Sequence, residues 1–128
     1  MNKRVVLLED NKQCLELMEE ILSDEGYHVI PINHYEGIDD IMEFGPQLIL
    51  MDIRLSNGYG HLLCEDLKAN AATNHIPVIL VSGADNLEKI ANDCHADNFL
   101  SKPFDLQNLL HLVKKYVLPD RHVLPRFE

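Results

Sequence analysis

Two carboxylates stand side by side where the first apolar segment of this chain ends. The stretch VVLLEDN at residues 5–11 places Glu9 and Asp10 directly after four aliphatic residues. Two like charges at the end of a buried strand repel each other, and this costs free energy unless a cation or hydrogen-bond donors offset it. The pair is therefore either a solvated or helix-capping feature, or part of a site that binds a positively charged group.

Polar side chains also follow three later apolar segments. Asp52 comes after QLILM, Ser82 after PVILV, and Lys102 after DNFLS. If these segments are parallel strands, their carboxyl ends meet at one edge of a sheet, where ligands bind in open α/β folds. Three acids, a hydroxyl and an ammonium group would then converge. Clustered carboxylates suit Mg²⁺, which typically binds through one or two of them together with waters and phosphate oxygens.

The hydrophobic pattern predicts the strands that position these side chains. Continuous aliphatic runs are typical of strands covered on both faces of a parallel sheet, and three such runs occur, with two weaker ones. Pro31 cannot donate a hydrogen bond to a neighbouring strand, which suits an edge position for the second segment. The five predicted strands span residues 4–8, 28–32, 47–51, 77–81 and 97–101.

Helical patterns lie between the predicted strands. Gly26 is well placed to end the first helix, and Asp105 to cap the start of the last one. Five strands alternating with five helices indicate a doubly wound α/β fold, with right-handed crossovers and helices on both faces of the sheet. The predicted apolar faces contain Cys14, Leu17, Met18, Ile21 and Leu22 in the first helix, and Leu106, Leu109, Leu110, Val113 and Val117 in the last.

The length and composition indicate one globular domain. The chain has 128 residues, of which 46% are hydrophobic, enough for one sizeable core. We expect this domain to span residues 1–118. The remainder, 119–128, carries two prolines and no periodicity, and so is expected to be an irregular tail.

The charge balance excludes several classes of partner. Eleven basic and 21 acidic residues give a formal net charge of −10, which opposes attraction to nucleic acid or to anionic lipid.

No apolar run is long enough to span a bilayer, and the first residues do not form a signal peptide, so we expect a cytoplasmic protein. Three widely spaced cysteines without a CxxC pair predict neither a disulfide framework nor a zinc site.

Taken together, these features resemble the receiver domain of two-component response regulators, in particular the single-domain chemotaxis regulators. The resemblance covers residues 3–117 and is carried by LLEDN, LILMDIRLSNGYG, VILVSGAD and FLSKPF, in this order. It implies a five-stranded sheet with the flavodoxin-like strand order 2-1-3-4-5. Several spaced motifs at strand ends make the match far more specific than any one of them.

The resemblance implies a role for each acidic residue. Asp52 would be the phosphoacceptor, Asp10 a direct Mg²⁺ ligand, and Glu9 a ligand through water. Asp52 and the carbonyl oxygen of Arg54 would complete the protein's share of the metal site. Such a domain is not an enzyme acting on other molecules, because it catalyses only its own phosphorylation and dephosphorylation.

The resemblance also implies the residues that transmit the signal. Lys102 would pair with the phosphoryl group, Ser82 would donate a hydrogen bond to it, and Phe99 would change rotamer. The peptide bond before Pro103 would be cis. A histidine kinase or a histidine phosphotransfer protein would donate the phosphoryl group, and the face of the fourth helix, fifth strand and fifth helix would bind a downstream protein.

Three other interpretations stay open at this point. A haloacid-dehalogenase-like phosphatase also forms an aspartyl phosphate, but it needs a second acid where this chain has Arg54. A flavodoxin-like nucleotide-binding module needs a loop of glycine, serine or threonine after the first strand, where Glu9 and Asp10 would repel phosphate. A degenerate receiver that only binds proteins would lack a working site, although no key position is lost here.

Overall fold

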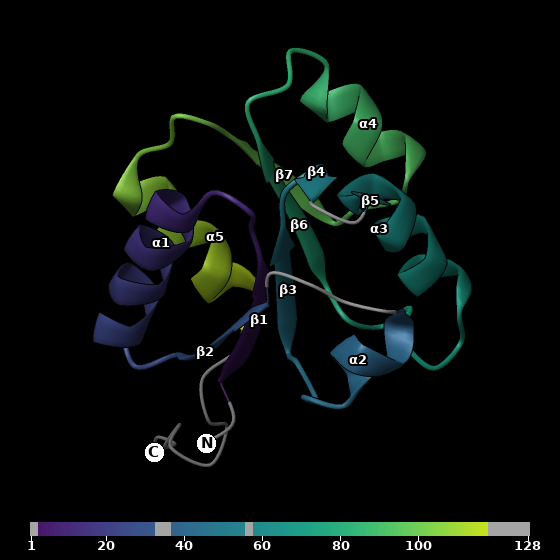
Figure 1. Cartoon of the computed structure of the whole chain (residues 1–128), viewed down its shortest axis with the longest axis horizontal. Coiled ribbons are helices and arrows are strands. Elements are labelled where there is room, and N and C mark those ends of the chain that lie inside the picture. Colours follow the sequence, from purple (N-terminus) through teal and green to yellow (C-terminus); the bar gives the residue numbers. More distant parts are fainter. Residues whose placement is uncertain (1–2, 33–36, 56–57, 118–128) are drawn as a thin grey trace, which may run out of the picture.

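A parallel sheet of five strands forms the centre of the computed structural model (Figure 1), which describes residues 3–32, 37–55 and 58–117. The sheet order is β2-β1-β3-β6-β7, so the predicted order 2-1-3-4-5 is confirmed. The expected tail at 119–128 lies outside the described residues. The strands of the sheet are β1 (Arg4–Leu8), β2 (His28–Ile32), β3 (Leu48–Met51), β6 (Val78–Ser82) and β7 (Asn98–Ser101).

Helices cover both faces of the sheet, as the alternation of strands and helices predicted. One face is covered by α1 (Lys12–Asp24) and α5 (Leu106–Tyr116), which lie together in Figure 1. The other face is covered by α2 (Ile38–Met42), α3 (Gly60–Ala69) and α4 (Leu87–Asp93). Within the described residues, no helix is long and apolar enough to cross a membrane.

The strands divide the core into two layers because successive side chains point to opposite faces of the sheet. On β1, Val6 and Leu8 pack into the cluster beneath α3 and α4, whereas Val5 and Leu7 pack into the cluster beneath α1 and α5. Every residue of β3 and β6 is buried, which explains their unbroken aliphatic runs. Strand β2 lies at the edge of the sheet with Pro31 exposed, as predicted.

The ends of the first and last helices follow from local capping. The side chain of Asn11 accepts a hydrogen bond from the Cys14 amide at 2.9 Å and so starts α1. Gly26, with a φ of 93°, follows the end of that helix, a conformation that glycine adopts without strain. Asp105 caps α5 by accepting from the Gln107 amide at 2.8 Å. The roles predicted for Gly26 and Asp105 are therefore confirmed.

Two leucines that were predicted to lie on buried helix faces are largely exposed. Leu17 in α1 is 48% exposed, and Leu106 in α5 is 45% exposed. The buried stripe of α1 is filled by Met18 and Leu22, so Leu17 lies at the solvent side of that stripe. The buried face of α5 is formed by Leu109 and Val113, whereas Leu106 is the first residue of the helix.

A small two-stranded sheet follows β3 that the hydrophobic pattern did not predict. It consists of β4 (Arg54–Leu55) and β5 (Gly58–Tyr59), which pair in antiparallel orientation. Strands of two residues are too short to show a periodicity of two. The element is important for the site because it turns the chain back immediately after Asp52 and leads directly into α3.

Candidate functional site

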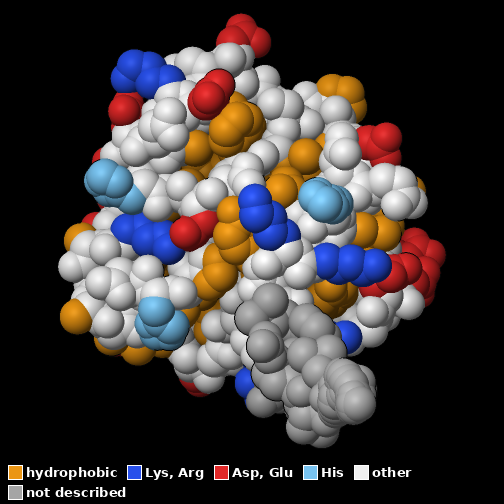
Figure 2. Space-filling view, turned by 180° about the vertical axis from the view of Figure 1, so that it is seen from behind, with side chains coloured by type: hydrophobic (Ala, Val, Ile, Leu, Met, Phe, Trp, Pro, Cys, Tyr) orange, Lys and Arg blue, Asp and Glu red, His pale blue; other side chains and the backbone are white. Residues whose placement is uncertain are grey.

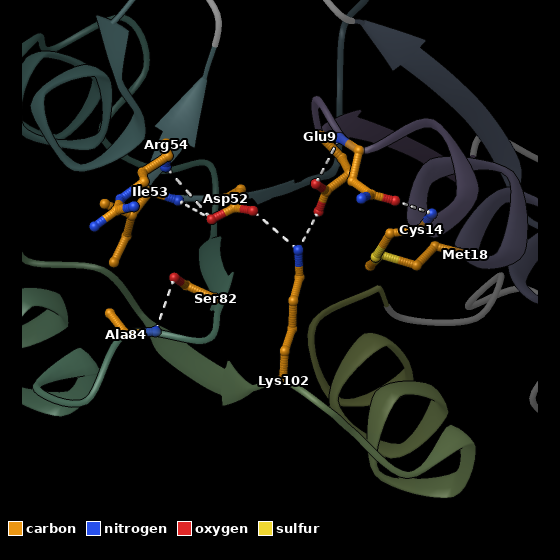
Figure 3. Close-up of polar contacts among 10 residues, drawn as sticks. Glu9, Cys14, Met18, Asp52, Ile53, Arg54, Ser82, Ala84 and Lys102 are labelled. Carbon is orange, nitrogen blue, oxygen red and sulfur yellow. Dashed lines mark hydrogen bonds and ion pairs between the residues drawn. The ribbon is translucent and has the colours of Figure 1, made fainter.

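The carboxyl ends of the parallel strands bring the predicted polar residues together. Glu9 follows β1 and Asp52 follows β3, whereas Lys102 follows β7. Ser82, expected just after its strand, is instead the last residue of β6, where it pairs in register with Ser101. Figure 3 shows the side chains of Glu9, Asp52, Ser82 and Lys102 gathered at this edge of the sheet.

Lys102 connects two of the carboxylates. Its Nζ donates to Oε1 of Glu9 at 2.7 Å and to Oδ2 of Asp52 at 2.9 Å (Figure 3). Burial alone would lower the pKa of Lys102, but the hydrogen bonds with Glu9 and Asp52 outweigh it and raise the pKa well above its ordinary value. Lys102 therefore carries a firm positive charge at neutral pH. The peptide bond between Lys102 and Pro103 is cis, as predicted.

Asp52 is held at both carboxylate oxygens. Besides the contact of Oδ2 with Lys102, Oδ1 accepts from the amide of Ile53 at 2.6 Å and from the amide of Arg54 at 3.4 Å. The side chain is 15% exposed, so it remains open to solvent on one side. Sequence reasoning did not find the contribution of Ile53, because a backbone amide is present whatever the residue type.

Asp10 interacts with the charge of Asp52 but makes none of the hydrogen bonds that join Glu9, Lys102 and Asp52. Its carboxyl group is largely exposed. Its pKa is raised mainly by partial burial and, to a smaller extent, by repulsion from the carboxylate of Asp52. The helix-capping role that Asp10 might have had belongs to Asn11 instead. The negative charges of Asp10 and Asp52 therefore repel each other.

The donor set fits Mg²⁺, although it is not a closed cage. Among the described residues, no three His, Cys, Asp or Glu side chains converge closely enough to hold a metal unaided. Mg²⁺ typically needs only one or two carboxylates, with waters and phosphate oxygens as its other ligands. Asp10 and Asp52 supply two mutually repelling carboxylates that a cation would relieve. Glu9 already accepts from Lys102 and from the amide of Asn11, which suits a contact through water.

A cavity of about 270 Å³ opens beside Asp52. Ser82 lines it with a side chain that is almost fully buried, and its Oγ accepts from the amide of Ala84 at 3.2 Å. The hydroxyl proton of Ser82 is consequently available to a group inside the cavity. The cavity is lined by Asp52, Ile53, Arg54, Ser82, Gly83 and Ala84.

Phe99 is not among the residues that line this cavity. It lies on β7 opposite Leu80 of β6 and packs, partly buried, against the core cluster that also contacts Ala84. Phe99 thus packs against the core on the α3 and α4 side of the sheet and does not line the cavity. Its predicted change of rotamer stays a prediction.

Sequence reasoning did not predict the contacts that two residues make close to the site. Cys14 was expected to be only an apolar helix residue, but its thiol lies beside Glu9, and burial and the charge of Glu9 raise its pKa. Gly60 packs against the backbone after β3: its amide donates to the carbonyl of Ile53 at 2.5 Å, and a Cβ here would overlap the carbonyl oxygen of Asp52. The glycine's position eight residues after Asp52 was visible in the sequence, but its contact was not.

This chain is similar in sequence to known proteins of one family. A family model described as the response regulator receiver domain matches residues 5–114. The polar-differentiation response regulator DivK of Brucella anthropi is 32% identical over 122 residues, which cover 91% of this chain and 98% of DivK. DivK of Brucella ovis is 31% identical over the same shares of both chains.

Solved structures show the same fold. A CheY-like response regulator receiver domain protein from Methanospirillum hungatei superposes with a TM-score of 0.80 at 28% identity, covering 91% of this chain and 94% of that one. The receiver domain of the sensor histidine kinase PA1611 from Pseudomonas aeruginosa superposes with a TM-score of 0.77 at 21% identity, covering 91% and 98%. The PA1611 structure has a magnesium ion coordinated in its active-site cleft.

Proposed function

The chain belongs to the response regulator receiver family of two-component signalling, and from this premise we propose that Asp52 accepts a phosphoryl group. The observation that carries the proposal is the position of Asp52, whose carboxylate borders an open cavity and contacts Lys102 at 2.9 Å. The donor would be a phosphorylated histidine of a kinase or of a phosphotransfer protein. Small acyl phosphates have the same transferable group and can replace it in a test.

The chemistry follows from the groups around the cavity. A carboxylate oxygen of Asp52 attacks the phosphorus atom, the new O–P bond forms, and the bond from phosphorus to the donor breaks. Both reactants are negative, so the reaction needs positive charge close to the transferred oxygens. Lys102 supplies one such charge, and the Ser82 hydroxyl supplies a hydrogen bond from the cavity wall.

Mg²⁺ would be held by Asp10, Asp52 and the carbonyl oxygen of Arg54, with Glu9 acting through water. When bound, it supplies further positive charge for the phosphoryl oxygens. The repulsion between Asp10 and Asp52 supports this assignment, because a cation between them would remove it. With Mg²⁺ bound, Asp52 would still be the nucleophile, and Lys102 would still hold its carboxylate in place.

The output would be a change at the face formed by α4, β7 and α5. Ser82 ends β6, and the segment 83–86 joins it to α4, while Phe99 lies on the neighbouring strand β7. Movement of Ser82 towards a phosphoryl group would therefore act on α4 and on the packing of Phe99. The partner would be a protein rather than nucleic acid. The side of the molecule in Figure 2 agrees with this, since its basic side chains are scattered among acidic and hydrophobic ones.

Acetyl phosphate and Mg²⁺ test the proposal directly. We expect the chain to gain the mass of one phosphoryl group, located at Asp52 by peptide mass spectrometry. Asp52→Asn removes the nucleophile and prevents this addition, while Asp10→Asn slows it and weakens Mg²⁺ binding in calorimetric titration.

Asp85→Asn is a matched control, because Asp85 is an exposed carboxylate outside the cluster, in the segment before α4. It is expected to react like the wild type. Complete labelling of the Asp52→Asn variant would contradict the assignment of the nucleophile. A wild-type chain that binds no Mg²⁺ and gains no phosphoryl group would instead indicate a degenerate receiver that only binds proteins.

A further inference from the structure

Two buried cysteines lie in contact where α3 passes the end of α4. Cys64 belongs to α3, and Cys94 directly follows the last residue of α4. They are 0% and 1% exposed, and both are free thiols in the structure. The Sγ of Cys64 donates to the carbonyl oxygen of Cys94 at 3.4 Å, and the Sγ of Cys94 donates to the carbonyl oxygen of Ala91 at 3.6 Å. Neither thiol takes part in the site around Asp52.

A partly exposed ion pair links the two segments that carry the cysteines. Lys68, one turn after Cys64, lies 2.6 Å from the carboxylate of Asp97 and donates to the carbonyl of Ile76 at 2.8 Å. The same carboxylate accepts from the amide of Val78 at 2.8 Å. Helix α3 is thus tied to the segment that leads from α4 into β7. These contacts hold the segments that carry the two thiols against each other.

The end of α4 fixes the position of Cys94 itself. Its amide donates to the carbonyl of Ile90 at 3.0 Å, and the amide of Ala96 donates to the carbonyl of Ala91 at 2.9 Å. His95 between them has a φ of 65°, which reverses the chain after the helix. The thiol of Cys94 is therefore held beneath its helix and beside α3, rather than on a freely moving loop.

We propose that Cys64 and Cys94 form an oxidation site, in which a two-electron oxidant joins them as a disulfide that ties α3 to the end of α4. With a peroxide, the sulfur of Cys94 attacks one peroxide oxygen, the O–O bond breaks, and Cys94 becomes a sulfenic acid with release of water. The sulfur of Cys64 then attacks the sulfenic sulfur. The S–S bond forms, the S–O bond breaks, and a second water leaves with the thiol proton.

The acidity of the two thiols supports this order of events. The neighbouring thiol of Cys64 lowers the pKa of Cys94, against the opposite effect of burial. The neighbouring thiol of Cys94, together with burial, raises the pKa of Cys64. Cys94 is consequently the better nucleophile towards peroxide, and Cys64 acts second. Asn92, Asp93 and His95 around Cys94 are exposed, so a local opening of the helix end suffices to admit a small oxidant.

The disulfide would constrain the part of the chain that contains β6 and α4. Residues 64 and 94 are 30 positions apart, and the loop closed between them contains β6 and α4. A cross-link of this length restricts the unfolded chain, so we expect it to raise the Tm on the order of 10 °C. The site is separate from Asp52, and its chemistry does not depend on the proposed phosphorylation.

The test uses the full folded chain with hydrogen peroxide and no phosphodonor. Trypsin separates the three cysteines, because Cys14, Cys64 and Cys94 fall in the peptides 13–54, 55–68 and 90–114. We expect 55–68 and 90–114 to be joined, with a mass about 2 Da below the sum of the two reduced peptides. Cys14 stays available to an alkylating reagent. Dithiothreitol is expected to separate the peptides again and to reverse the shift in Tm.

Single variants supply the controls. Cys64→Ala and Cys94→Ala are each expected to lose the cross-link and the shift in Tm, whereas Cys14→Ala retains both. If either buried variant fails to fold, the peptide map of the wild type and its reversal by dithiothreitol decide alone. Two unmodified thiols after peroxide treatment, separate oxidation to sulfinic acids, or disulfides that involve Cys14 or a second molecule would each overturn the proposal.

Discussion

The ammonium group of Lys102 lies 2.7 Å from the carboxylate of Glu9, whose side chain is only 3% exposed. Removing one partner of a buried ion pair leaves the other charge without compensation. We therefore expect Lys102→Met to lower the free energy of unfolding by about 2–4 kcal/mol in urea titrations without Mg²⁺.

Two further variants identify the cause of this loss. Lys102→Met combined with Glu9→Gln removes the stranded charge and should recover part of the stability. Lys89→Met breaks an exposed pair with Asp93 in α4 and is expected to change the free energy of unfolding by less than about 0.5 kcal/mol. Equal losses for Lys102→Met and Lys89→Met would show that the burial of Glu9 does not matter.

Asp10→Asn is expected to stabilise the chain in the absence of Mg²⁺. The pKa of Asp10 is raised above 3.8 in the folded state, so its ionised form is disfavoured by folding. The penalty is absent below pH 3.8 and complete once the pH exceeds the raised pKa. The gain in Tm from Asp10→Asn should therefore be present at pH 7 and shrink as the pH falls towards 3.8.

With Mg²⁺ present, we expect the wild type to be more stable than Asp10→Asn. The wild type binds Mg²⁺ more tightly, and binding stabilises the folded state. Asp85→Asn should show neither effect. A variant Asp10→Asn that is less stable than the wild type at pH 7 without Mg²⁺ would contradict the repulsion between Asp10 and Asp52.

Gly60→Ala is expected to disturb Asp52, because the added Cβ would overlap the carbonyl oxygen of that residue. Overpacking of this kind typically destabilises a protein by about 1–3 kcal/mol. Gly83→Ala is the matched control, since its Cβ would lie 4.0 Å from the Cβ of Lys102, an ordinary contact distance. Denaturant titration should separate the two variants, and phosphorylation by acetyl phosphate should be slower only in Gly60→Ala.

Arg54→Ala is expected to shorten the lifetime of the phosphorylated state. Arg54 is exposed and lines the cavity beside Asp52, where a long cationic side chain can shield a phosphoryl group from water. Ala84 on the other side is too small to compensate. The decay is measured by phosphate release after the donor is removed, with Arg54→Lys as a control that keeps charge and length. An unchanged or longer lifetime in Arg54→Ala would count against shielding.

Ser82→Ala should separate phosphorylation from its output. The variant loses one neutral hydrogen bond, worth about 0.5–1.5 kcal/mol, so Asp52 should still be modified. The same loss changes the ratio of two closely balanced conformers by roughly two-fold to ten-fold. We expect smaller chemical-shift changes around Phe99 and α4 on phosphorylation. Ser101→Ala, at the paired position on β7, is the control, and a full wild-type response in Ser82→Ala would exclude this route.

Local features of the fold could be predicted from the sequence because they depend on near neighbours. Aliphatic runs marked β1, β3 and β6 to within one residue, since strands buried on both faces need apolar residues throughout, and two weaker apolar segments marked β2 and β7 equally closely. The cap formed by Asp105 and the position of Gly26 depend on contacts within one turn of helix. The order of the strands came from the family resemblance, because pairing joins segments far apart in the chain.

The chemical types at the candidate site were determined by the sequence, but their contacts were decided by the tertiary structure. The convergence of Glu9, Asp52, Ser82 and Lys102 could be predicted because acidic, hydroxyl and ammonium side chains follow or end the predicted strands. That Lys102 contacts Glu9, 93 positions away, depends on how β1 and β7 are placed around β3 and β6. No local pattern carries that information.

The same reason accounts for what sequence reasoning missed. Cys64 and Cys94 are 30 positions apart in the sequence, and only the packing of α3 against the end of α4 brings them into contact. Leu17 fitted the apolar face of α1, yet the width of the buried stripe is set by the surface that the helix meets. Residue type and spacing thus determined which groups this chain can use, and packing between distant segments decided which of them touch.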